Sequence, residues 1–146
     1  MKIYLDACCL NRPFDDQSQN RIRLESEAII IIMSLLKKEV GEWISSEVLE
    51  AELENTPDIE KRAYLTELSK SAHTSIAITE KEITRANELE NIGFKGFDAM
   101  HIACSESAGN DVFLTTDDKL LKKAVREKDK LNVQIANPLS WMMERL

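Results

Sequence analysis

The chain has 146 residues, of which 43% are hydrophobic and 31% are charged, an ordinary composition for one globular domain. We therefore expect a single domain over residues 1–146. The formal net charge is −7, which argues against a protein coated in basic surface for nonspecific binding of nucleic acid. Any nucleic-acid site must therefore be local.

The sequence argues against membrane insertion and against disulfide crosslinking. The longest apolar run, Ala28–Leu36, falls well short of the roughly 20 residues that a membrane span requires. Asp6 follows the first five residues without an extended apolar segment, so we expect no secretory signal and a cytoplasmic location. The cysteines are odd in number and two are adjacent, which suits neither a disulfide framework nor paired zinc-binding motifs. We expect reduced, buried thiols at Cys8, Cys9 and Cys104.

The first half of the chain alternates predicted strands and helices. Lys2–Leu5 is a short apolar run ending in polar, turn-prone residues, which predicts a buried strand with Asp6 at its carboxyl end. A long core helix is predicted over Arg21–Lys38, where acids come early and lysines late around an apolar middle, as the helix dipole favours. The next elements are a strand, a helix capped by a serine and a further helix: Gly41–Ile44, the helix after Ser45 or Ser46, and about Asp58–Ser71.

The second half continues the alternation. Thr79, with Glu82 three residues later, predicts a capping box that opens a helix ending at Asn91. Gly93 and Gly109 follow predicted helices and stop them. The strands and helices of this half are expected in this order: Ser75–Ile78, Thr79–Asn91, about Phe97–Ala108, Val112–Thr115, Asp117 to about Glu127, and Leu131–Ile135.

Strands that alternate with helices predict an α/β fold with a mostly parallel sheet and helices on both faces. In such sheets ligands bind beyond the carboxyl ends of the strands. Asp6 follows the first strand, Glu52 lies on the helix after the second, and Asp117 follows the fourth. Asp98 opens the helix before that fourth strand, so its N-terminal end can point to the same edge. Four carboxylates in one place repel unless a cation joins them.

Four motifs stand in a spaced order along the chain: Ile3-Tyr-Leu-Asp6, Ser46-x5-Glu52-Leu53, Phe97-Asp98-Ala-x-His101-Ile-Ala103 and Leu114-Thr115-x-Asp117. In this order they resemble the motifs of PIN-domain nucleases, and over residues 1 to about 136 the chain looks like a VapC-type toxin. The resemblance implies a three-layer α/β/α fold and a metal-dependent endoribonuclease. It also implies that Asp6, Glu52, Asp98 and Asp117 bind Mg²⁺ or Mn²⁺, with Thr115 supporting the site. Toxins of this family commonly form homodimers and are blocked by an antitoxin protein bound near the site.

Further residues are candidates around these acids. Asn11 and Arg12 follow the first motif and are expected to contact the RNA substrate or support the site, although an Asn-Arg-Pro segment is as readily a turn. Asp118 is expected to be a cap or a supporting acid. Lysines follow Asp117 closely enough to hold a phosphate backbone, or to be a solvated helix face. They are Lys119, Lys122 and Lys123.

Each acid has a second interpretation. Asp98 and Asp117 fall in helix N-terminal turns, which favour negative charge in any protein. Glu50 competes with Glu52, which we prefer because it keeps the family spacing from Ser46. His101 lies one turn beyond Asp98 in an alanine-rich helix, where packing is the more usual role. Cys8 stands where many relatives have Ser or Asn, which puts this secondary contact in doubt.

Two other classes of function are considered. A phospho-accepting receiver switch also gathers acids and a Thr at the carboxyl ends of a parallel sheet. It normally needs a Lys after its last strand, whereas Leu131–Ile135 is followed by Ala136-Asn-Pro138. The other alternative is a PIN fold kept as an RNA- or partner-binding module without turnover. For a nuclease, water is the expected nucleophile, because no Ser-His-Asp set stands out.

Overall fold

A five-stranded, all-parallel sheet lies at the centre of the molecule. The structure, a computed structural model, describes residues 1–145. The strands are arranged in the order β3-β2-β1-β4-β5, and every neighbouring pair is parallel. A receiver domain orders its strands 2-1-3-4-5, so the topology excludes that alternative. The strands are β1 (Lys2–Leu5), β2 (Glu42–Ser46), β3 (Thr74–Ile76), β4 (Val112–Leu114) and β5 (Gln134–Ala136).

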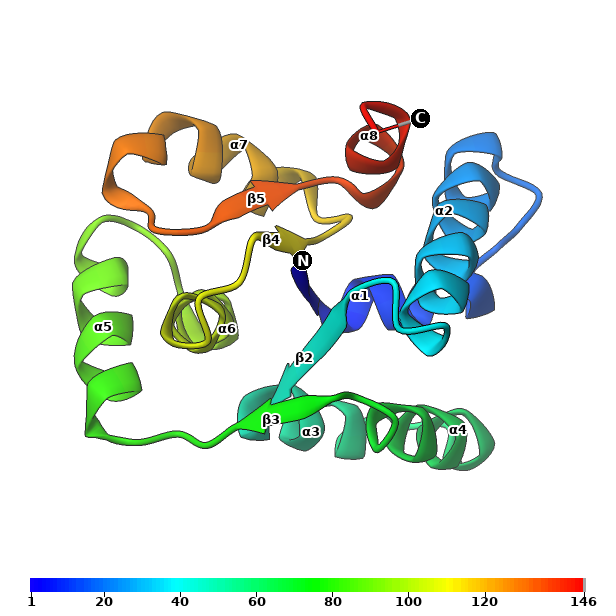
Figure 1. Ribbon diagram of the computed structural model, residues 1–146, viewed down its shortest axis with the longest axis horizontal. Coiled ribbons are helices and arrows are strands. Elements are labelled where there is room, and N and C mark those ends of the chain that lie inside the picture. The colour runs from blue at the N-terminus through cyan, green and yellow to red at the C-terminus, as the bar shows by residue number, and fades with distance from the viewer. Residues whose placement is uncertain (146) are drawn as a thin grey trace.

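Helices cover both faces of the sheet, which confirms the predicted α/β/α architecture. In Figure 1, α5 and α6 lie on one side of the strands and α2 and α8 on the other. Two single-turn 3₁₀ helices cover Arg12–Phe14 and Lys128–Lys130. The α-helices are α1 (Ala7–Asn11), α2 (Asn20–Lys37), α3 (Glu47–Glu54), α4 (Ile59–Ser69), α5 (Glu80–Asn91), α6 (Gly96–Ser107), α7 (Asp118–Arg126) and α8 (Pro138–Met143). None of the described helices is long and apolar enough to cross a bilayer.

Strand β1 is the centre of the core. Its residues Ile3, Tyr4 and Leu5 are buried, as expected of a parallel strand covered on both faces. Ile3 is in register with Trp43 of β2 on one side and with Val112 of β4 on the other. This pairing continues past the end of β1, where the Asp6 N–H donates to the Leu114 carbonyl at 3.0 Å. Asp6 therefore begins at the carboxyl edge of the sheet.

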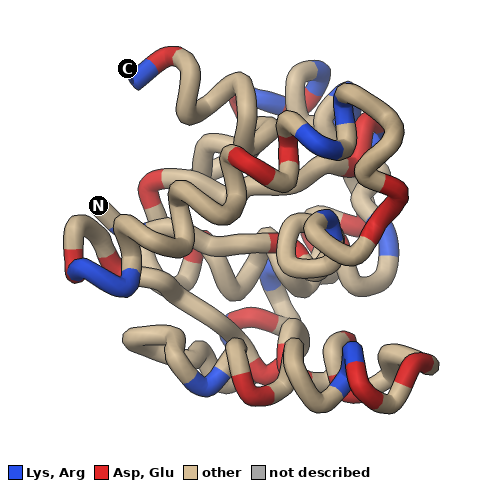
Figure 2. The backbone as a smooth tube through the Cα atoms, turned by 90° about the vertical axis from the view of Figure 1, so that its right-hand side faces the viewer, with Lys and Arg blue, Asp and Glu red and all other residues tan. Residues whose placement is uncertain are grey.

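Helix α2 is apolar on more than its buried face. Ala28, Ile29, Ile32 and Leu36 are buried in the core, whereas other apolar side chains of the same helix are exposed. In Figure 2 the residue 28–36 part of α2 lacks the blue and red of charged residues. The exposed apolar residues are Ile30, Ile31 and Leu35.

Two helices have no counterpart in the sequence prediction, and several strand limits differ. Helix α1 follows Asp6 directly, and α8 begins after Asn137, which caps it by accepting the N–H groups of Leu139 and Ser140. The last strand covers residues 134–136 instead of 131–135. Its predicted first half is diverted from the sheet, because the Asn132 N–H donates to the Glu106 carboxylate at 2.8 Å. β3 also begins and ends earlier than predicted, at residues 74–76.

Candidate active site

The carboxyl edge of the sheet gathers the polar residues that follow the central strands. Asp6 follows β1 and caps α1, Ser46 ends β2 and caps α3, and Thr115 follows β4. Asp117 caps α7 two residues later. Because all these strands run in the same direction, their ends meet at one edge. We call Asp6, Glu52, Asp98 and Asp117 the rim acids.

The Asp6 carboxylate is held by donors from both of its neighbouring segments. Its Oδ1 accepts the Ala7 N–H at 2.8 Å, and its Oδ2 accepts the Thr115 hydroxyl at 2.8 Å. Burial raises the pKa of Asp6, an effect that His101 and the Thr115 hydrogen bond oppose and that the Glu52 charge reinforces. The buried Thr115 hydroxyl also accepts the Asp117 N–H at 3.2 Å. Thr115 thus connects two of the rim acids.

Glu52 and Asp6 meet at His101. Its Nε2 lies 3.0 Å from Glu52 Oε1 and 3.9 Å from Asp6 Oδ1. One potential ligand atom from each of the three residues lies within 4.8 Å of the others. His101 is fully buried, as packing would require, but packing alone leaves its contact with Glu52 unexplained. The sequence signal for this contact was the one-turn spacing between Asp98 and His101, which does not reveal Glu52.

Asp98 is a partly buried rim acid with a raised pKa. It lies in the first turn of α6, after Gly96 turns the chain with φ +49°, a conformation that glycine adopts readily. Burial raises the pKa of Asp98 to about 6, and the charges of Asp6 and Asp117 add to the rise. Lys95, not Asp98, is the N-cap residue of α6. Within residues 1–145 the Asp98 carboxylate accepts no hydrogen bond, so capping does not explain it.

Asp117 does act as a cap. Its Oδ1 accepts the N–H groups of Lys119 at 2.9 Å and Leu120 at 3.3 Å. Among the described residues, these bonds use only one of the two carboxylate oxygens. The interpretation of Asp117 as a helix cap is therefore correct. Capping uses Oδ1 and leaves Oδ2 available to a ligand.

The rim acids suit a hard divalent cation. Mg²⁺ and Mn²⁺ prefer carboxylate oxygens, and the rim offers four carboxyl groups from four separate segments. Burial and mutual repulsion raise the pKa of both Asp6 and Asp98. A cation among these oxygens would relieve that repulsion. The residues present therefore fit such an ion.

Comparison with known proteins identifies the family of this chain. The family model of the PIN domain matches residues 3–126. The chain belongs to the PIN-domain family. The sequence matches none of the curated proteins with which it was compared.

Solved structures share the fold of this PIN domain at low sequence identity. One is FitAcB from Neisseria gonorrhoeae, with a TM-score of 0.59, 14% identity, and coverage of 93% of this chain and 97% of that chain. A second is VapBC2 from Rickettsia felis bound to a DNA fragment from their promoter, with a TM-score of 0.59, 13% identity, and coverage of 94% of this chain and 98% of that chain. A third is VapBC-1 from nontypeable Haemophilus influenzae, with a TM-score of 0.61, 15% identity, and coverage of 94% of this chain and 98% of that chain. These likenesses show the shared fold.

Several residues expected near the site of the PIN domain are engaged elsewhere. The Asn11 side chain donates to the Ala7 carbonyl at 2.9 Å. Arg12 forms an ion pair with buried Glu25 at 2.7 Å, and Asp118 forms one with Arg21 at 2.7 Å. The structure gives none of these three predicted residues a contact with a rim acid, and their roles in support or substrate binding stay predictions.

The three predicted lysines of α7 differ from one another. Lys119 and Lys122 are exposed. Lys123 is half-buried, donates to the Gly93 carbonyl, and lies over the Phe94 ring at 5.9 Å. Lys123 therefore has a structural contact that Lys119 and Lys122 lack.

Cys8 takes a place in the site despite its departure from the family pattern. Its Sγ lies 3.4 Å from Asp6 Oδ2 and 3.3 Å from the Thr115 hydroxyl, and it accepts the Thr116 N–H at 3.3 Å. A thiol thus occupies the position where many relatives have Ser or Asn.

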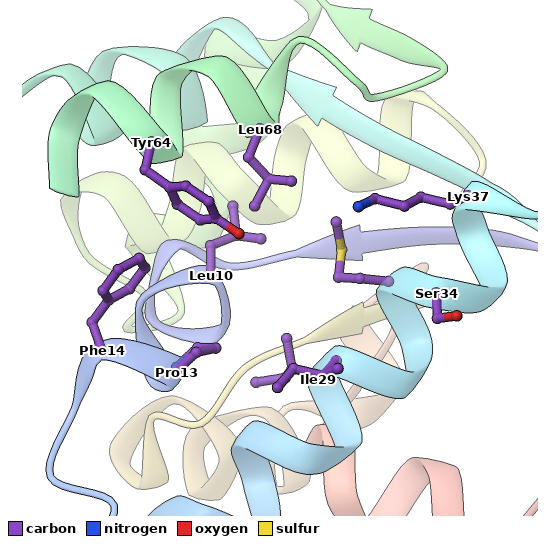
Figure 3. Close-up of a pocket in the computed structure, with 10 residues that line it drawn as sticks. Leu10, Pro13, Phe14, Ile29, Ser34, Lys37, Tyr64 and Leu68 are labelled. Carbon is purple, nitrogen blue, oxygen red and sulfur yellow. The ribbon is translucent and has the colours of Figure 1, made fainter. Parts of the chain in front are cut away.

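An apolar groove lies between α2 and α4. It encloses about 340 Å³. Figure 3 shows Tyr64 and Leu68 of α4 on one wall, Ile29 of α2 on another, and Leu10 and Phe14 between them. The Phe14 and Tyr64 rings meet edge to face at 5.4 Å, although about half of each side chain is exposed. Leu10 belongs to α1, the helix that Asp6 caps. One residue of the groove is therefore only four positions from a rim acid in the sequence.

Proposed function

We propose that this PIN domain is a Mg²⁺- or Mn²⁺-dependent endoribonuclease that acts in the cytoplasm as the toxin of a type II toxin–antitoxin system. The observation that carries the proposal is the group of Asp6, Glu52 and His101, whose potential ligand atoms lie within 4.8 Å of one another at the carboxyl edge of a parallel sheet. Asp98 and Asp117 lie outside that group, but the charges of Asp6 and Asp117 act on Asp98. The raised pKa values of Asp6 and Asp98 support it, because clustered carboxylates cost stability unless they serve a ligand. Membership of a family whose members are generally nucleases also supports it.

The chain itself contributes fixed oxygen ligands and a proton-exchanging group. Asp6 is kept in place by Thr115 and by the Ala7 N–H. The Asp98 carboxyl, with its pKa raised to about 6, exchanges a proton near neutral pH when no cation is bound. A divalent cation held by these oxygens would polarise a phosphodiester and activate water for attack. Both ring nitrogens of His101 are occupied by Tyr4 and Glu52, so His101 is not the base of a serine nucleophile.

RNA cleavage tests the proposal. Single-stranded RNA should be cut by the purified protein with Mg²⁺ or Mn²⁺ and left intact with EDTA. Asp98→Asn and Asp6→Asn should each lower the rate by at least about 100-fold, whereas Asp16→Asn, an exposed acid outside the site, should leave it unchanged. Full activity in excess EDTA contradicts the mechanism. Mn²⁺ binding without any cleavage would favour the binding module without turnover.

The apolar groove supports a protein partner. We assign it to an amphipathic helix of an antitoxin, since apolar side chains of two helices face each other there and helices commonly bind such grooves through one apolar face. Once an antitoxin is identified by its suppression of toxicity, Ile30→Glu should weaken its binding at least about tenfold. Lys70→Glu, at the end of α4 away from the groove lining, is the control. Equal binding by both variants would place the partner elsewhere.

The family resemblance also supports a homodimer. Light scattering after size-exclusion chromatography should give twice the mass of the 16.6 kDa chain. A mass of one chain at micromolar concentration would contradict a stable dimer.

A further inference from the structure

We infer that His101 is a positioning residue that holds the Glu52 carboxylate at the candidate metal site through its Nε2–H, and that Tyr4 and Ser46 satisfy the other ring nitrogen and hold the ring in place. The inference rests on the proposed function for its metal, but its structural part concerns a chain of hydrogen bonds in the metal-free protein. That chain connects four separate elements: β1, β2, α3 and α6.

The contacts form a continuous line from the backbone of α3 to Glu52. The Leu49 N–H donates to Ser46 Oγ at 3.1 Å, and Ser46 Oγ lies 2.6 Å from the Tyr4 hydroxyl. The Tyr4 hydroxyl lies 2.6 Å from His101 Nδ1, and His101 Nε2 lies 3.0 Å from Glu52 Oε1. Every link is within hydrogen-bonding distance.

The direction of the bonds follows from what each group can donate. An ionised Glu52 carboxylate only accepts, so His101 Nε2 must carry the hydrogen. In the neutral ring Nδ1 is then an acceptor, and Tyr4, with its single hydroxyl hydrogen, donates to it. Ser46 in turn donates to the Tyr4 oxygen, while its own oxygen accepts from Leu49 N–H. All four links are satisfied at once in this direction.

Burial makes this direction difficult to abandon. Ser46, Tyr4 and His101 are each fully buried, and a buried donor or acceptor without a partner is costly. The Tyr4 ring is also fixed by stacking on Phe113 at 5.2 Å and by its edge contact with His101 at 5.7 Å. A ring flip of His101 would therefore break both of its hydrogen bonds.

The arrangement specifies what His101 does for Glu52. Glu52 has a long side chain that is 27% exposed, and its helix offers no other hydrogen bond to that carboxylate in the described part of the chain. The bond from His101 restrains Oε1 beside Asp6 and leaves Oε2 for a cation. With the hydrogen on Nε2, the ring has no lone pair facing the carboxylates. His101 therefore orients a ligand instead of acting as one, a role that partners of metal ligands commonly have.

Two measurements test the inference. Long-range ¹H–¹⁵N correlation spectra of the metal-free protein in mildly alkaline buffer should show the neutral His101 ring protonated at Nε2. Tyr4→Phe should shift the Nδ1 resonance, because Nδ1 loses its donor, and should leave the hydrogen on Nε2, because the Glu52 carboxylate still accepts it. A neutral wild-type ring protonated at Nδ1 overturns the inference.

Calorimetric Mn²⁺ binding provides the second measurement. His101→Gln retains an N–H donor near the position of Nε2 and should bind Mn²⁺ within about threefold of wild type, whereas His101→Asn is too short and should bind about 10–100-fold more weakly. Equal losses in both variants would mean that the ring itself is a ligand, and no loss in either would remove His101 from the site. Circular dichroism checks that both variants fold, and Tyr4→Phe keeps the test independent of them. Wild-type protein that binds Mn²⁺ but cuts no RNA would overturn the proposed function alone.

Discussion

Carboxylates lie in two contrasting settings in this molecule. Glu25 of α2 is 1% exposed and accepts from Arg12 at 2.7 Å, Arg21 at 3.3 Å and Asn137 at 2.6 Å. Asp98, also partly buried, accepts no hydrogen bond within residues 1–145, and its pKa is raised to about 6. A carboxylate whose oxygens are all paired stabilises the fold, whereas one left with like charges costs stability. The second kind is therefore where a ligand is expected.

The largest effect should come from Glu25→Ala. Removing the acceptor leaves Arg12 and Arg21 without their shared partner, and breaking a buried ion pair costs about 3–5 kcal/mol. Urea unfolding should show this loss, and Glu27→Ala, an exposed acid on the same helix, should change the free energy of unfolding by less than about 0.5 kcal/mol. Similar losses in both variants would remove the contrast between the two settings.

Asp98→Asn should change stability in the opposite direction. Without metal, the variant removes one charge from the rim acids and should gain about 1–2 kcal/mol at neutral pH, after allowance for partial solvent screening. With Mn²⁺ the order should reverse, because a ligand that binds only the native state stabilises it by mass action. Thermal melts of both proteins with EDTA and with Mn²⁺ measure this. An equal Mn²⁺ shift in the two proteins would exclude Asp98 from the metal site.

A third test compares how stability depends on pH. Hydrogen bonds from Ser107 and Thr79 lower the pKa of Glu82 from 4.5 to about 2, so the folded protein binds fewer protons than the unfolded chain in that range. Its stabilisation is present above pH 4.5 and is lost as the pH falls towards 2. The pKa of Asp98 is raised from 3.8 to about 6, so its contribution declines as the pH rises through that range.

Glu82→Gln and Asp98→Asn should therefore remove pH dependences of opposite sign, each of about 1 kcal/mol per pH unit, from the free energy of unfolding of the metal-free protein. Urea titrations at a series of pH values measure both slopes. Parallel slopes in the two variants would contradict the contrast between paired and unpaired acids.

The smallest effect concerns the surroundings of the rim acids. Lys119→Glu with Lys122→Glu should reduce the slope of log K against log salt for single-stranded RNA by about 1–2, because each phosphate contact contributes about 0.7. Lys70→Glu is the control. Lys123→Glu is kept separate, since it also breaks the contact with Gly93. An unchanged slope would return the two lysines to a solvated helix face.

Local signals predicted the parts of the molecule that depend on short stretches of sequence. The apolar run before Asp6 predicted β1, and the Thr79 and Glu82 pair predicted a capping box that the structure confirms. The alternation of strands and helices predicted the layers. Helix α8 also had a local signal, a capping Asn followed by Pro, which the prediction did not use.

Contacts between distant residues could not be predicted in this way. The ion pair of Arg12 with Glu25 on another helix had no signal in the local sequence. His101 meets Glu52 across 49 positions of the sequence and Tyr4 across 97. Packing between elements determines which carboxylates surround a cation and which ring nitrogen of a histidine carries the hydrogen. The periodicity of one element does not predict such contacts.

The central position of β1 in the sheet also has a consequence for synthesis. Although β1 is made first, one of its edges pairs with β4, whose residues follow it by more than 100 positions, as in the register of Ile3 with Val112. Asp6 cannot meet Thr115 until that strand has left the ribosome. Such distant pairing forms slowly, because a long loop must close first. A nascent or truncated chain that ends before β4 therefore lacks an assembled rim, and the rim acids come together only after β4 has been made.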